Sequence, residues 1–377
     1  MFEPAKAKRL SIPQWEAVYR AEIYPGVISF AAIHDTTRGR ALGGCRMAKY
    51  DSESLAMTDV LRLSRGMTFK NAVADLPLGG GKSIIVCDPL VDGEKRDTIL
   101  AEFGKFIAWV NSEKDRYYTA EDMNTTVADM HVVKKYTQNI FGTTVDPSPY
   151  TAEGVFQSAK YTVDYFAMDL FHGERTLEGK KVLVQGLGKV GHTLIDMFHS
   201  AGAKLYINDI NEKSIQEALR KYPEAVVVSA EDLLTTEVDV FAPCAKGEVV
   251  DKGNVNQLNC KILCGAANNI LQNSTMGYEL QKRGIVYCPD YVANMGGVCS
   301  IQYLEVEQLS IETCIENIGK TVRKMLGLTF RTGFRNNLPF NIAVDHAVKK
   351  IIWGGEKINE EFQNDTLFPH TSAAEPH

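Results

Sequence analysis

The chain has 377 residues, of which 45% are hydrophobic, 23% charged and 9% aromatic, and its formal net charge is −6. This composition is typical of a globular protein, and the length exceeds one ordinary hydrophobic core, so two domains are expected. The slightly acidic balance and the lack of a basic tract argue against nucleic acid or an anionic membrane as the main partner.

The N-terminus predicts a protein that stays in the cytoplasm. Residues 1–20 contain no long apolar run and no small-residue cleavage site, so they do not resemble a secretory signal. No stretch approaches the roughly 20 apolar residues of a membrane span. The eight cysteines form no CxxC pair and no histidine completes a zinc pattern, so we expect reduced thiols and no metal site.

The first part of the chain interleaves strands and helices. The short β-branched runs 28–34 and 83–87 predict strands. Residues 53–66 have apolar side chains at a helical period and predict a helix that ends at Gly66, and residues 97–111 repeat the pattern. A mixed α/β domain is therefore expected here.

The character of the sequence changes after residues 142–154, which are rich in Gly, Pro, Ser and Thr and predict a domain boundary. A helix is expected over about 152–171. Beyond it, short apolar strands alternate with segments long enough for helices, a rhythm typical of βαβ units. The second domain is therefore expected to contain a parallel sheet.

Two amphipathic helices are predicted near the C-terminus, over about 302–326 and within 337–353. We expect helices within about 330–363 to return to the first domain, and the polar residues 364–377 to form a disordered tail. The expected domains are thus residues 1–148 joined by the returning helices, and residues 149–329.

A dinucleotide-binding pattern lies within residues 182–198. A predicted strand is followed by Gly186-x-Gly188-x-x-Gly191 and a helix. The first glycine permits a tight turn, the second lets the backbone approach a pyrophosphate, and the third lets the helix pack on the strand. The helix N-terminus also offers N–H donors to phosphates. The residues expected at the cofactor are Gly186, Leu187, Gly188, Lys189, Val190 and Gly191.

An acidic residue at the right distance strengthens this pattern, which alone arises by chance. Asp209 ends the next predicted strand, where a carboxylate binds the adenosine ribose hydroxyls. Its charge would repel the 2′-phosphate of NADP. We therefore expect a Rossmann-type domain that binds NAD.

Two lysines, Lys70 and Lys82, lie in one apolar segment, and Lys82 follows three glycines. A P-loop would need a glycine at Leu76 and a helix after Lys82, but the residues that follow predict a strand, so that alternative fails. Surface lysines with buried stems are the ordinary explanation. A redox enzyme explains the glycines better, because a buried lysine near a second cation loses proton affinity and can act as a general base.

A series of motifs resembles the glutamate/leucine/phenylalanine/valine dehydrogenase family, most closely its leucine and phenylalanine dehydrogenases. They follow one another in family order over about residues 30–300: ALGGCRM, RLSRGMTFKNAVADLPLGGGK, TAEDMNTTV, GLGKVG, APCA, GAANN and PDYVANMGG. The resemblance implies oxidative deamination, in which an L-amino acid, NAD⁺ and water give a 2-oxo acid, ammonia and NADH. It also implies a homo-oligomer, at least a dimer, formed through the first domain.

The resemblance assigns the chemistry to three side chains. By family position, Lys82 activates the water that attacks the imino intermediate, Asp122 exchanges protons with the amino nitrogen, and Lys70 pairs with the substrate carboxylate. Gly43 and Gly44 would bring backbone N–H groups to that carboxylate. Without the family context, Asp122 is as well explained as a helix cap.

The resemblance also implies a set of residues around the cofactor. Thr151 would reach the nicotinamide amide, Arg46 would approach the pyrophosphate, and Asn268 would touch substrate as well as cofactor. For the three alanines of this set, Ala245, Ala266 and Ala267, simple close packing is the alternative explanation. The expected cleft residues are Cys244, Ala245, Ala266, Ala267 and Asn268.

The pocket for the substrate side chain is expected to be apolar. A charged side chain would lose its hydration there without gaining a partner, which argues against glutamate. The small Ala120 and the branched pocket residues favour leucine, isoleucine or valine, with phenylalanine or tryptophan as the alternative. Lys189, Asn124 and Met295 depart from the family pattern. By family position the pocket is formed by Leu42, Ala120, Val298 and Ile301.

Two other classes of function are less compatible with the sequence. A protein that binds the cofactor without chemistry would not need Lys70, Lys82 and Asp122 together. A hydroxy-acid dehydrogenase would normally use a catalytic histidine with an acidic partner, and no histidine here lies in such a motif. The sequence therefore favours an NAD-dependent enzyme that acts on an apolar L-amino acid.

Overall fold

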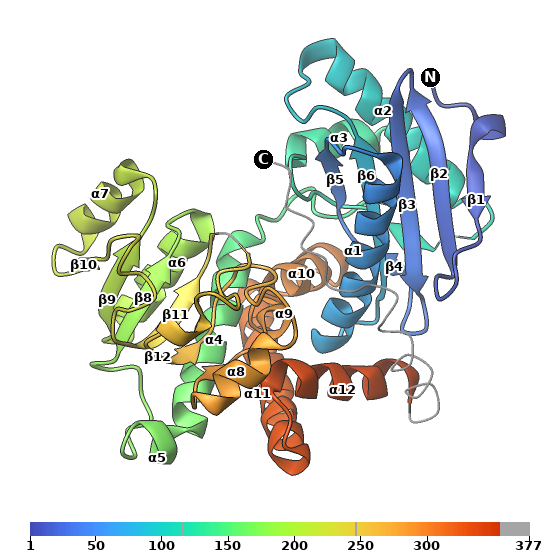
Figure 1. The fold of residues 1–377 in the computed structure, drawn as a ribbon. Coiled ribbons are helices and arrows are strands. Elements are labelled where there is room, and N and C mark those ends of the chain that lie inside the picture. The colour runs from blue at the N-terminus through green and yellow to red at the C-terminus, as the bar shows by residue number, and fades with distance from the viewer. Residues whose placement is uncertain (115, 246, 355–377) are drawn as a thin grey trace. The chain divides into compact units, whose positions relative to one another are not determined.

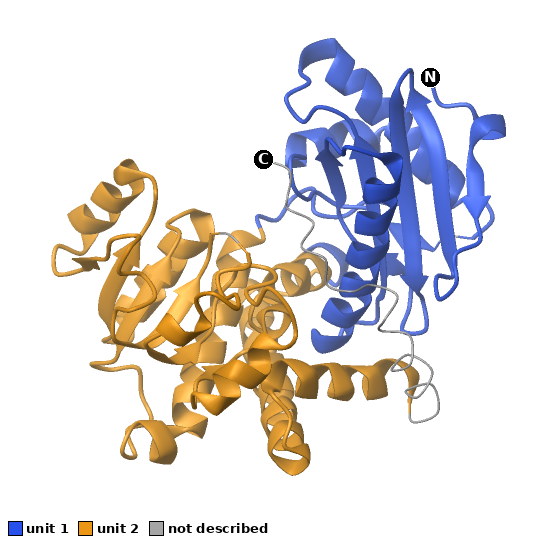
Figure 2. Cartoon of the chain, in the orientation of Figure 1, with its two compact units in different colours: residues 1–146, 305–307, 373–377 blue, residues 147–304, 308–372 orange. Residues whose placement is uncertain are grey.

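The computed structural model describes residues 1–114, 116–245 and 247–354, and these form two compact units (Figure 1, Figure 2). Over the described residues, the first unit comprises residues 1–146 with 305–307, and the second comprises 147–304 with residues from 308 onward. The chain first passes between the units at 146/147, inside the Pro-rich segment that predicts the boundary.

The first unit is a mixed sheet with helices packed on it. The strands are β1 (Lys8–Leu10), β2 (Ala17–Tyr24), β3 (Val27–Asp35), β4 (Ala41–Leu42), β5 (Cys45–Ala48), β6 (Gly79–Val86) and β7 (Tyr117–Tyr118). The helices are α1 (Glu53–Val73), α2 (Gly93–Val110) and α3 (Val127–Lys134), and a 3-10 turn spans Pro4–Lys6.

Helices cover both faces of the sheet, with α1 on one face and α2 and α3 on the other. The strand order is β1-β2-β3-β6-β4-β7, with β5 beside β6. Ala31 and Ile33 of β3 pack into a core that includes Phe103 and Ile107 of α2. Side chains alternate along a strand, so Ala32 faces the other side, where α1 packs on β3 and β6 (Figure 1). The mixed α/β prediction is confirmed, and β3 and α2 match their predicted segments.

Two predicted boundaries near the lysines are wrong. The helix does not end at Gly66 but runs on to Val73 as α1, because its last turns bury Thr68 and Phe69 against the sheet. Strand β6 begins at Gly79 rather than at Ser83, so the three glycines belong to the strand. With these corrected boundaries, Lys70 lies in α1 and Lys82 lies in β6, and the helix packs on the strand.

The second unit is a parallel sheet of alternating strands and helices. The strands are β8 (Lys181–Gln185), β9 (Lys204–Asn208), β10 (Val226–Val227), β11 (Val238–Pro243), β12 (Cys260–Leu263) and β13 (Val286–Tyr287). The helices are α4 (Ser148–Tyr165), α5 (Ala167–Leu170), α6 (Lys189–Ser200), α7 (Glu212–Lys221), α8 (Met276–Lys282), α9 (Asp290–Ala293) and α10 (Gly296–Ser300), with a 3-10 turn at Val255–Gln257.

The strand order β10-β9-β8-β11-β12-β13 is that of a dinucleotide-binding sheet, with the chain reversing direction across the sheet between β8 and β11. Every ladder in this sheet among the described residues is parallel. The predicted βαβ rhythm and the Rossmann-type fold are therefore confirmed. The crevice at the carboxyl ends of β8 and β11 is where such sheets bind ligands.

The C-terminal part differs from the predicted single helix over 302–326. A π-helical segment, Ile301–Val306, is followed by a break, and α11 (Ile311–Asn336) begins at Ser310, whose hydroxyl accepts from the Thr313 N–H. Helix α12 (Phe340–Trp353) follows. The break arises because Ser310 is a better N-cap than any residue upstream of it in the predicted helix.

Helices α11 and α12 group with the second unit, whereas the sequence-based division assigns residues from 330 to the first domain. Aromatic packing explains the grouping: the Phe330 ring lies 5.1 Å from that of Phe166 and 4.8 Å from that of Phe340. The predicted tail, 364–377, lies outside the described residues.

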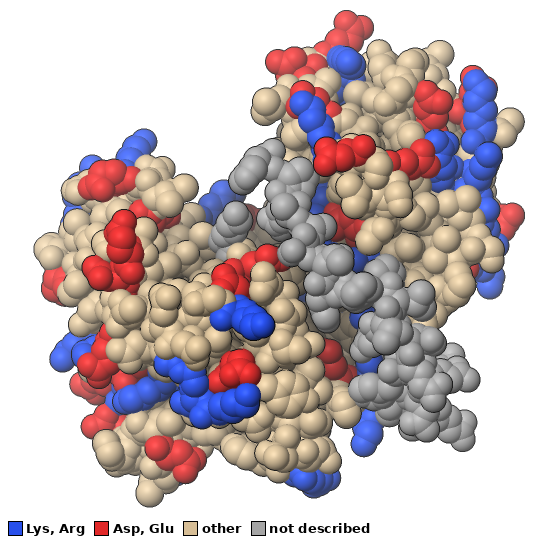
Figure 3. Space-filling view, viewed as in Figure 1, with Lys and Arg blue, Asp and Glu red and all other residues tan. Residues whose placement is uncertain are grey.

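Charges of both signs are interspersed over the visible face of the described residues (Figure 3). Within the part of the chain that the structure describes, no helix is long and apolar enough to cross a membrane.

Candidate active site

Lys82 and Asp122 form an ion pair in the first unit. The Lys82 ammonium lies 2.9 Å from the Asp122 carboxylate, and the side chains are 6% and 27% exposed. Lys82 lies on β6, on the face that α1 covers, and Asp122 lies in the loop between β7 and α3. The structure therefore brings together the two residues to which the resemblance assigns the chemistry.

The glycines before Lys82 are required by packing. A Cβ on Gly80 would lie 2.1 Å from the backbone nitrogen of Thr68 on α1, and one on Gly81 would lie 2.6 Å from the Tyr117 ring. Real Cβ atoms do not approach this closely, so only glycine lets β6 lie against both neighbours. This close packing holds Lys82 in a buried position. Packing alone therefore explains the glycines, and no bound phosphate is needed to account for them.

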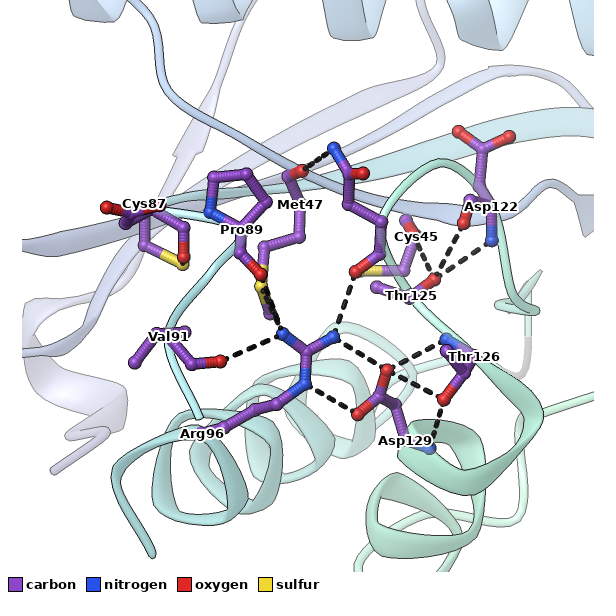
Figure 4. A network of polar contacts seen from close by, with 12 residues as sticks. Cys45, Met47, Cys87, Pro89, Val91, Arg96, Asp122, Thr125, Thr126 and Asp129 are labelled. Carbon is purple, nitrogen blue, oxygen red and sulfur yellow. Dashed lines mark hydrogen bonds and ion pairs between the residues drawn. The ribbon is translucent and has the colours of Figure 1, made fainter. Parts of the chain in front are cut away.

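The loop that carries Asp122 is fixed by a second network (Figure 4). Arg96 of α2 contacts both carboxylate oxygens of Asp129 at 2.8 Å and donates to the Asn124 carbonyl at 2.9 Å. The Asp122 N–H donates to the Thr125 hydroxyl at 2.9 Å. These bonds fix residues 122–125 of the loop, which carry the Asp122 carboxylate.

Asn124 departs from the usual family residue, and the backbone explains why it is tolerated. Its φ is +62°, in the left-handed region where glycine is favoured and asparagine is the commonest substitute. Its side-chain amide also donates to the Met47 carbonyl at 3.0 Å. The substitution therefore keeps the loop conformation.

The surroundings keep Asp122 charged. Burial alone would raise the pKa of this carboxyl, but the charges of Lys82 and Arg46 outweigh that effect and hold the pKa below its usual range. The thiol of Cys45 and the phenol of Tyr117 are neutral neighbours, because burial raises the pKa of each. The ground state is thus a carboxylate between two cations.

Lys70 lies in the last turn of α1 and is partly buried. It belongs to the helix that covers the Lys82 face of the sheet, as a substrate-binding cation in this layer would need. The charged group that the structure pairs with Lys82 is a carboxylate, however, and not the second lysine.

Gly43 and Gly44 allow the loop after β4 to approach the two charged residues. A Cβ on Gly43 would lie 1.7 Å from the Gly81 carbonyl oxygen, and one on Gly44 would lie 2.7 Å from the Asp122 Cβ. The Gly43 N–H donates to the Tyr118 carbonyl at 3.2 Å. That N–H is engaged in the sheet, which differs from the expectation that it faces a substrate carboxylate, because β4 pairs with β7.

Arg46 has partners that its predicted role did not include. Its Nε lies 3.4 Å from the Asp122 carboxylate and its Nη1 lies 3.0 Å from that of Asp59 on α1. The Arg46 side chain is 12% exposed, and its guanidinium contacts two anions of its own unit. The sequence analysis missed Asp59; its signal is an acidic residue within the apolar helical pattern of 53–66.

The four residues predicted to line the side-chain pocket belong to different units. Leu42 and Ala120 of the first unit are 2% and 5% exposed, on neighbouring segments beside the Asp122 loop. Val298 lies in α10 and Ile301 begins the π-helical segment, both in the second unit. All four are apolar.

The glycine turn of the second unit joins β8 to α6, beside β11. Gly186 has a φ of +92°, and a Cβ on Gly191 would lie 1.9 Å from the Gly186 carbonyl oxygen. Gly188 is the N-cap of α6, yet a Cβ there would meet nothing within 4 Å. The fold itself therefore requires Gly186 and Gly191, whereas Gly188 keeps open the space at a helix N-terminus, which fits a pyrophosphate.

Asp209 lies against this turn, directly after β9. Its carboxylate accepts from the Leu187 N–H at 2.5 Å and from the Asn211 N–H at 2.7 Å. Lys189 and Val190 begin α6. Three features of this turn therefore match a dinucleotide: the backbone N–H groups at the start of α6, the open space at Gly188 and the Asp209 carboxylate.

Cys244 and Ala245 follow β11 and lie beside the turn. The Cys244 N–H donates to the Gln185 carbonyl at 2.7 Å, and a Cβ on Gly186 would lie 2.6 Å from the Ala245 Cβ. Residues 266–268 follow β12, the next strand of the sheet. These residues therefore gather at the carboxyl edge of the sheet, where the cleft is expected.

Asn294 is a second residue that the sequence analysis missed. Its side-chain amide donates to the Asn268 Oδ1 at 3.0 Å and to the Ala266 carbonyl at 3.2 Å, and it is 2% exposed. It therefore fixes the orientation of the Asn268 amide. Its signal in the sequence is a polar residue within the apolar stretch YVANMGG.

Thr151 lies in the first turn of α4, against α10. Its hydroxyl donates to the Pro147 carbonyl at 3.0 Å, and a Cβ on Gly297 would lie 2.6 Å from that hydroxyl. Met295, where the family usually has alanine, is fully buried just before α10. The structure thus brings Thr151 to the start of the segment that carries Val298.

Two expected absences concern metals and disulfides. Among the described residues, no cluster of three or more His, Cys, Asp or Glu side chains could hold a metal ion. No disulfide joins any of the eight cysteines, all of which belong to the described ranges.

Two family models match the chain. The model described as "Glu/Leu/Phe/Val dehydrogenase, dimerisation domain" matches residues 20–139, and the model described as "Glutamate/Leucine/Phenylalanine/Valine dehydrogenase" matches residues 146–332. Together they cover most of both units.

Characterised relatives match over nearly the whole chain. Leucine dehydrogenase of Bacillus subtilis is 38% identical over 89% of this chain and 91% of its own length. Leucine dehydrogenase of Geobacillus stearothermophilus is 40% identical over 89% of this chain and 90% of its own. The crystal structure of L-tryptophan dehydrogenase from Nostoc punctiforme superposes with a TM-score of 0.76 at 32% identity, covering 90% of this chain and 96% of that one.

Proposed function

Because this chain belongs to the glutamate/leucine/phenylalanine/valine dehydrogenase family, we propose that it catalyses the reversible, NAD-dependent oxidative deamination of an apolar L-amino acid. An amino acid, NAD⁺ and water give a 2-oxo acid, an ammonium ion, NADH and a proton. The observation that carries the proposal is the Lys82–Asp122 ion pair at 2.9 Å. Burying charges is costly, and a protein that only bound the cofactor would have no use for this pair.

The side chains of the first unit divide the proton transfers. When bound, NAD supplies the acceptor for the hydride of the substrate Cα. Lys82 must lose its own proton before it can act as a base, and the Asp122 carboxylate beside it is positioned to accept that proton. Lys82 then takes a proton from water as the water oxygen bonds to the iminium carbon, and Asp122 gives its proton to the nitrogen. Lys82 passes its proton back to Asp122 and takes the hydroxyl proton as the C=O bond forms and the C–N bond breaks, and the departing ammonia takes the Asp122 proton to become ammonium. Lys70 holds the substrate carboxylate.

Asp209 supports NAD over NADP. Its carboxylate lies at the glycine turn, 2.5 Å from the Leu187 nitrogen, where the adenosine ribose is bound in dinucleotide sheets. A 2′-phosphate placed there would meet the like charge of the carboxylate. The ribose hydroxyls of NAD, by contrast, can donate to the carboxylate.

Apolar pocket residues support a leucine, isoleucine or valine substrate. Leu42, Ala120, Val298 and Ile301 offer no partner to a charged side chain. The relatives named leucine dehydrogenase, and a valine dehydrogenase of Streptomyces virginiae, agree with this choice. A phenylalanine or tryptophan substrate is the alternative; the buried Met295, which departs from the family pattern, and the π-helical segment that begins at Ile301 are the features that support it.

An NADH absorbance assay with all twenty L-amino acids tests the function, and 2-oxo acids with ammonium test the reverse reaction. We expect the highest kcat/KM with leucine, isoleucine or valine. Contacts in an apolar pocket discriminate one methylene by only about 1–3 kcal/mol, so activity should spread over the aliphatic series. A preference of more than about a hundredfold for an aromatic amino acid would reverse the choice of substrate, and inactivity with every amino acid would refute the enzyme itself.

The assembly is inferred to be a homo-oligomer built through the first unit. The matching family model for residues 20–139 describes a dimerisation domain. Light scattering at working concentration should give at least twice the mass of one chain. A monomer would refute the inference.

A further inference from the structure

Arg46 lies between two carboxylates of the first unit. Its Nε lies 3.4 Å from Asp122 and its Nη1 lies 3.0 Å from Asp59. The Asp122 oxygen that faces Arg46 also contacts the Lys82 ammonium at 2.9 Å. Lys82, Asp122, Arg46 and Asp59 therefore form a row in which positive and negative charges alternate.

Asp59 is itself held in place. The Tyr50 hydroxyl donates to the Asp59 Oδ2 at 2.7 Å, the same oxygen that Arg46 contacts. Arg62, half of whose side chain is exposed, contacts the other oxygen at 3.2 Å. The Asp59 side chain is 13% exposed, so its charge acts on Arg46 with little screening by water.

We propose that Asp59 is a positioning residue for the reaction, which orients Arg46 and balances its charge so that Asp122 stays aligned with Lys82. The proposal rests on the proposed function. Without Asp59, the Arg46 cation would act on the Lys82–Asp122 pair unopposed, and it would favour the deprotonated form of each group.

The charges that act on Asp122 here come from the row of Lys82, Arg46 and Asp59, because the thiol and the phenol beside it are neutral. Lys82 reaches it from β6 and Arg46 from β5, and the nearby Cys45 and Tyr117 carry no charge, since burial raises the pKa of both. The charge that changes when Asp59 is neutralised is therefore felt through Arg46.

The test is the pH profile of kcat/KM for the amino-acid substrate in Asp59→Asn. The acidic limb of that profile reports the Lys82–Asp122 pair as one coupled unit. We expect the limb to move to lower pH by about 0.5–1 unit, with kcat lowered more than KM is raised. Tyr50→Phe keeps the charge and should lower kcat without moving the limb.

A matched control lies on the same helix. Glu53 of α1 also pairs with an arginine of the sheet, Arg20, at 2.6 Å, but it has no connection to Asp122. Glu53→Gln should leave the profile unchanged. Should Asp59→Asn fail to fold, Asp59→Glu moves the charge by one methylene and should show a smaller shift of the same sign.

The outcomes separate this inference from the proposed function. An inactive wild type would refute the proposed function. An active wild type whose acidic limb stays in place in Asp59→Asn, or in Asp59→Glu where the first variant does not fold, would overturn the positioning role. Activity lost only in proportion to melting temperature would do the same, because it would show a structural role alone.

Discussion

The catalytic part of the first unit and the glycine turn of the second unit are built in different ways. In the first, Lys82, Asp122 and Arg46 are charged side chains paired within 3.4 Å under a helix. In the second, backbone N–H groups, open space and one carboxylate form the site. We therefore expect the first site to fail when a side chain is removed, whereas the glycine turn of the second should fail when a side chain is added.

The sharpest test of the first half of this comparison is Lys82→Ala. Loss of a general base costs about 10²–10⁴-fold in rate, and here the Asp122 charge also loses its closest partner, so turnover should fall at least this far. NADH should still bind, because most of the residues proposed to hold it lie in the second unit and Lys82 is not among them. Steady-state rates and NADH fluorescence titration measure the two effects.

Lys70→Ala provides the control for this result. It removes a cation from the same layer but not the proposed base, so it should raise KM for the amino acid more than it lowers kcat. Unimpaired turnover in Lys82→Ala would sink the mechanism.

Two glycines test the second half of the comparison. Gly191→Ala places a Cβ 1.9 Å from the Gly186 carbonyl oxygen, so it should destabilise the second unit by about 1–3 kcal/mol or more. Gly188→Ala meets nothing within 4 Å, so its melting temperature should stay unchanged while NADH binds more weakly. Equal losses of stability in the two variants would contradict the separation of fold from ligand.

The sequence predicts the parts of this molecule that depend on local signals. Periodic apolar residues and turn residues locate β3, α2 and the glycine turn, since each pattern reports its own element. Gly66 shows where such signals fail: its helix continues because later residues are buried against the sheet, and burial overrides propensity.

The residues of the candidate active site also divide into those that local sequence patterns identify and those that depend on tertiary packing. The motif order identifies Lys82 and Asp122, but the partners of Arg46 depend on how α1 packs on the sheet, and no local pattern contains that information. Asp59 was missed for this reason. Asn294 was missed because its role is to orient another side chain, which a sequence pattern does not reveal.

Acid stability should distinguish the first unit, which buries a histidine as well as its charged row. His34 is 4% exposed, and burial lowers its pKa to about 4, below the ordinary value of 6.5. The unfolded chain therefore binds one more proton between pH 6.5 and 4, and stability falls as the pH falls through this window, by about 3 kcal/mol in all.

Urea unfolding at a series of pH values and fixed protein concentration measures this slope. His34→Gln should flatten it, whereas His131→Gln, an exposed histidine of the same unit, should not. The carboxyls of Asp122 and Asp129, whose pKa values are lowered, lose their contributions only at lower pH, so they do not obscure the window. An unchanged slope in His34→Gln would contradict the prediction.

The smallest expected effect concerns Asp209, the carboxylate at the glycine turn of the second unit. In the proposed function the Asp209 charge would repel a 2′-phosphate, and the carboxylate also accepts from the Leu187 N–H at 2.5 Å, which holds the turn. Asp209→Asn keeps an acceptor and removes the charge, so the preference for NAD over NADP should shrink by about tenfold with little loss of NAD efficiency. Asp209→Ala removes both the charge and the acceptor, so it should lose NAD efficiency as well.

The control is Asp196→Asn. Asp196 is a surface carboxylate of α6 that pairs with Lys221 at 2.7 Å, and its substitution should change neither the NAD efficiency nor the cofactor preference. A wild type that uses NADP as well as NAD would show that the Asp209 charge does not select the cofactor.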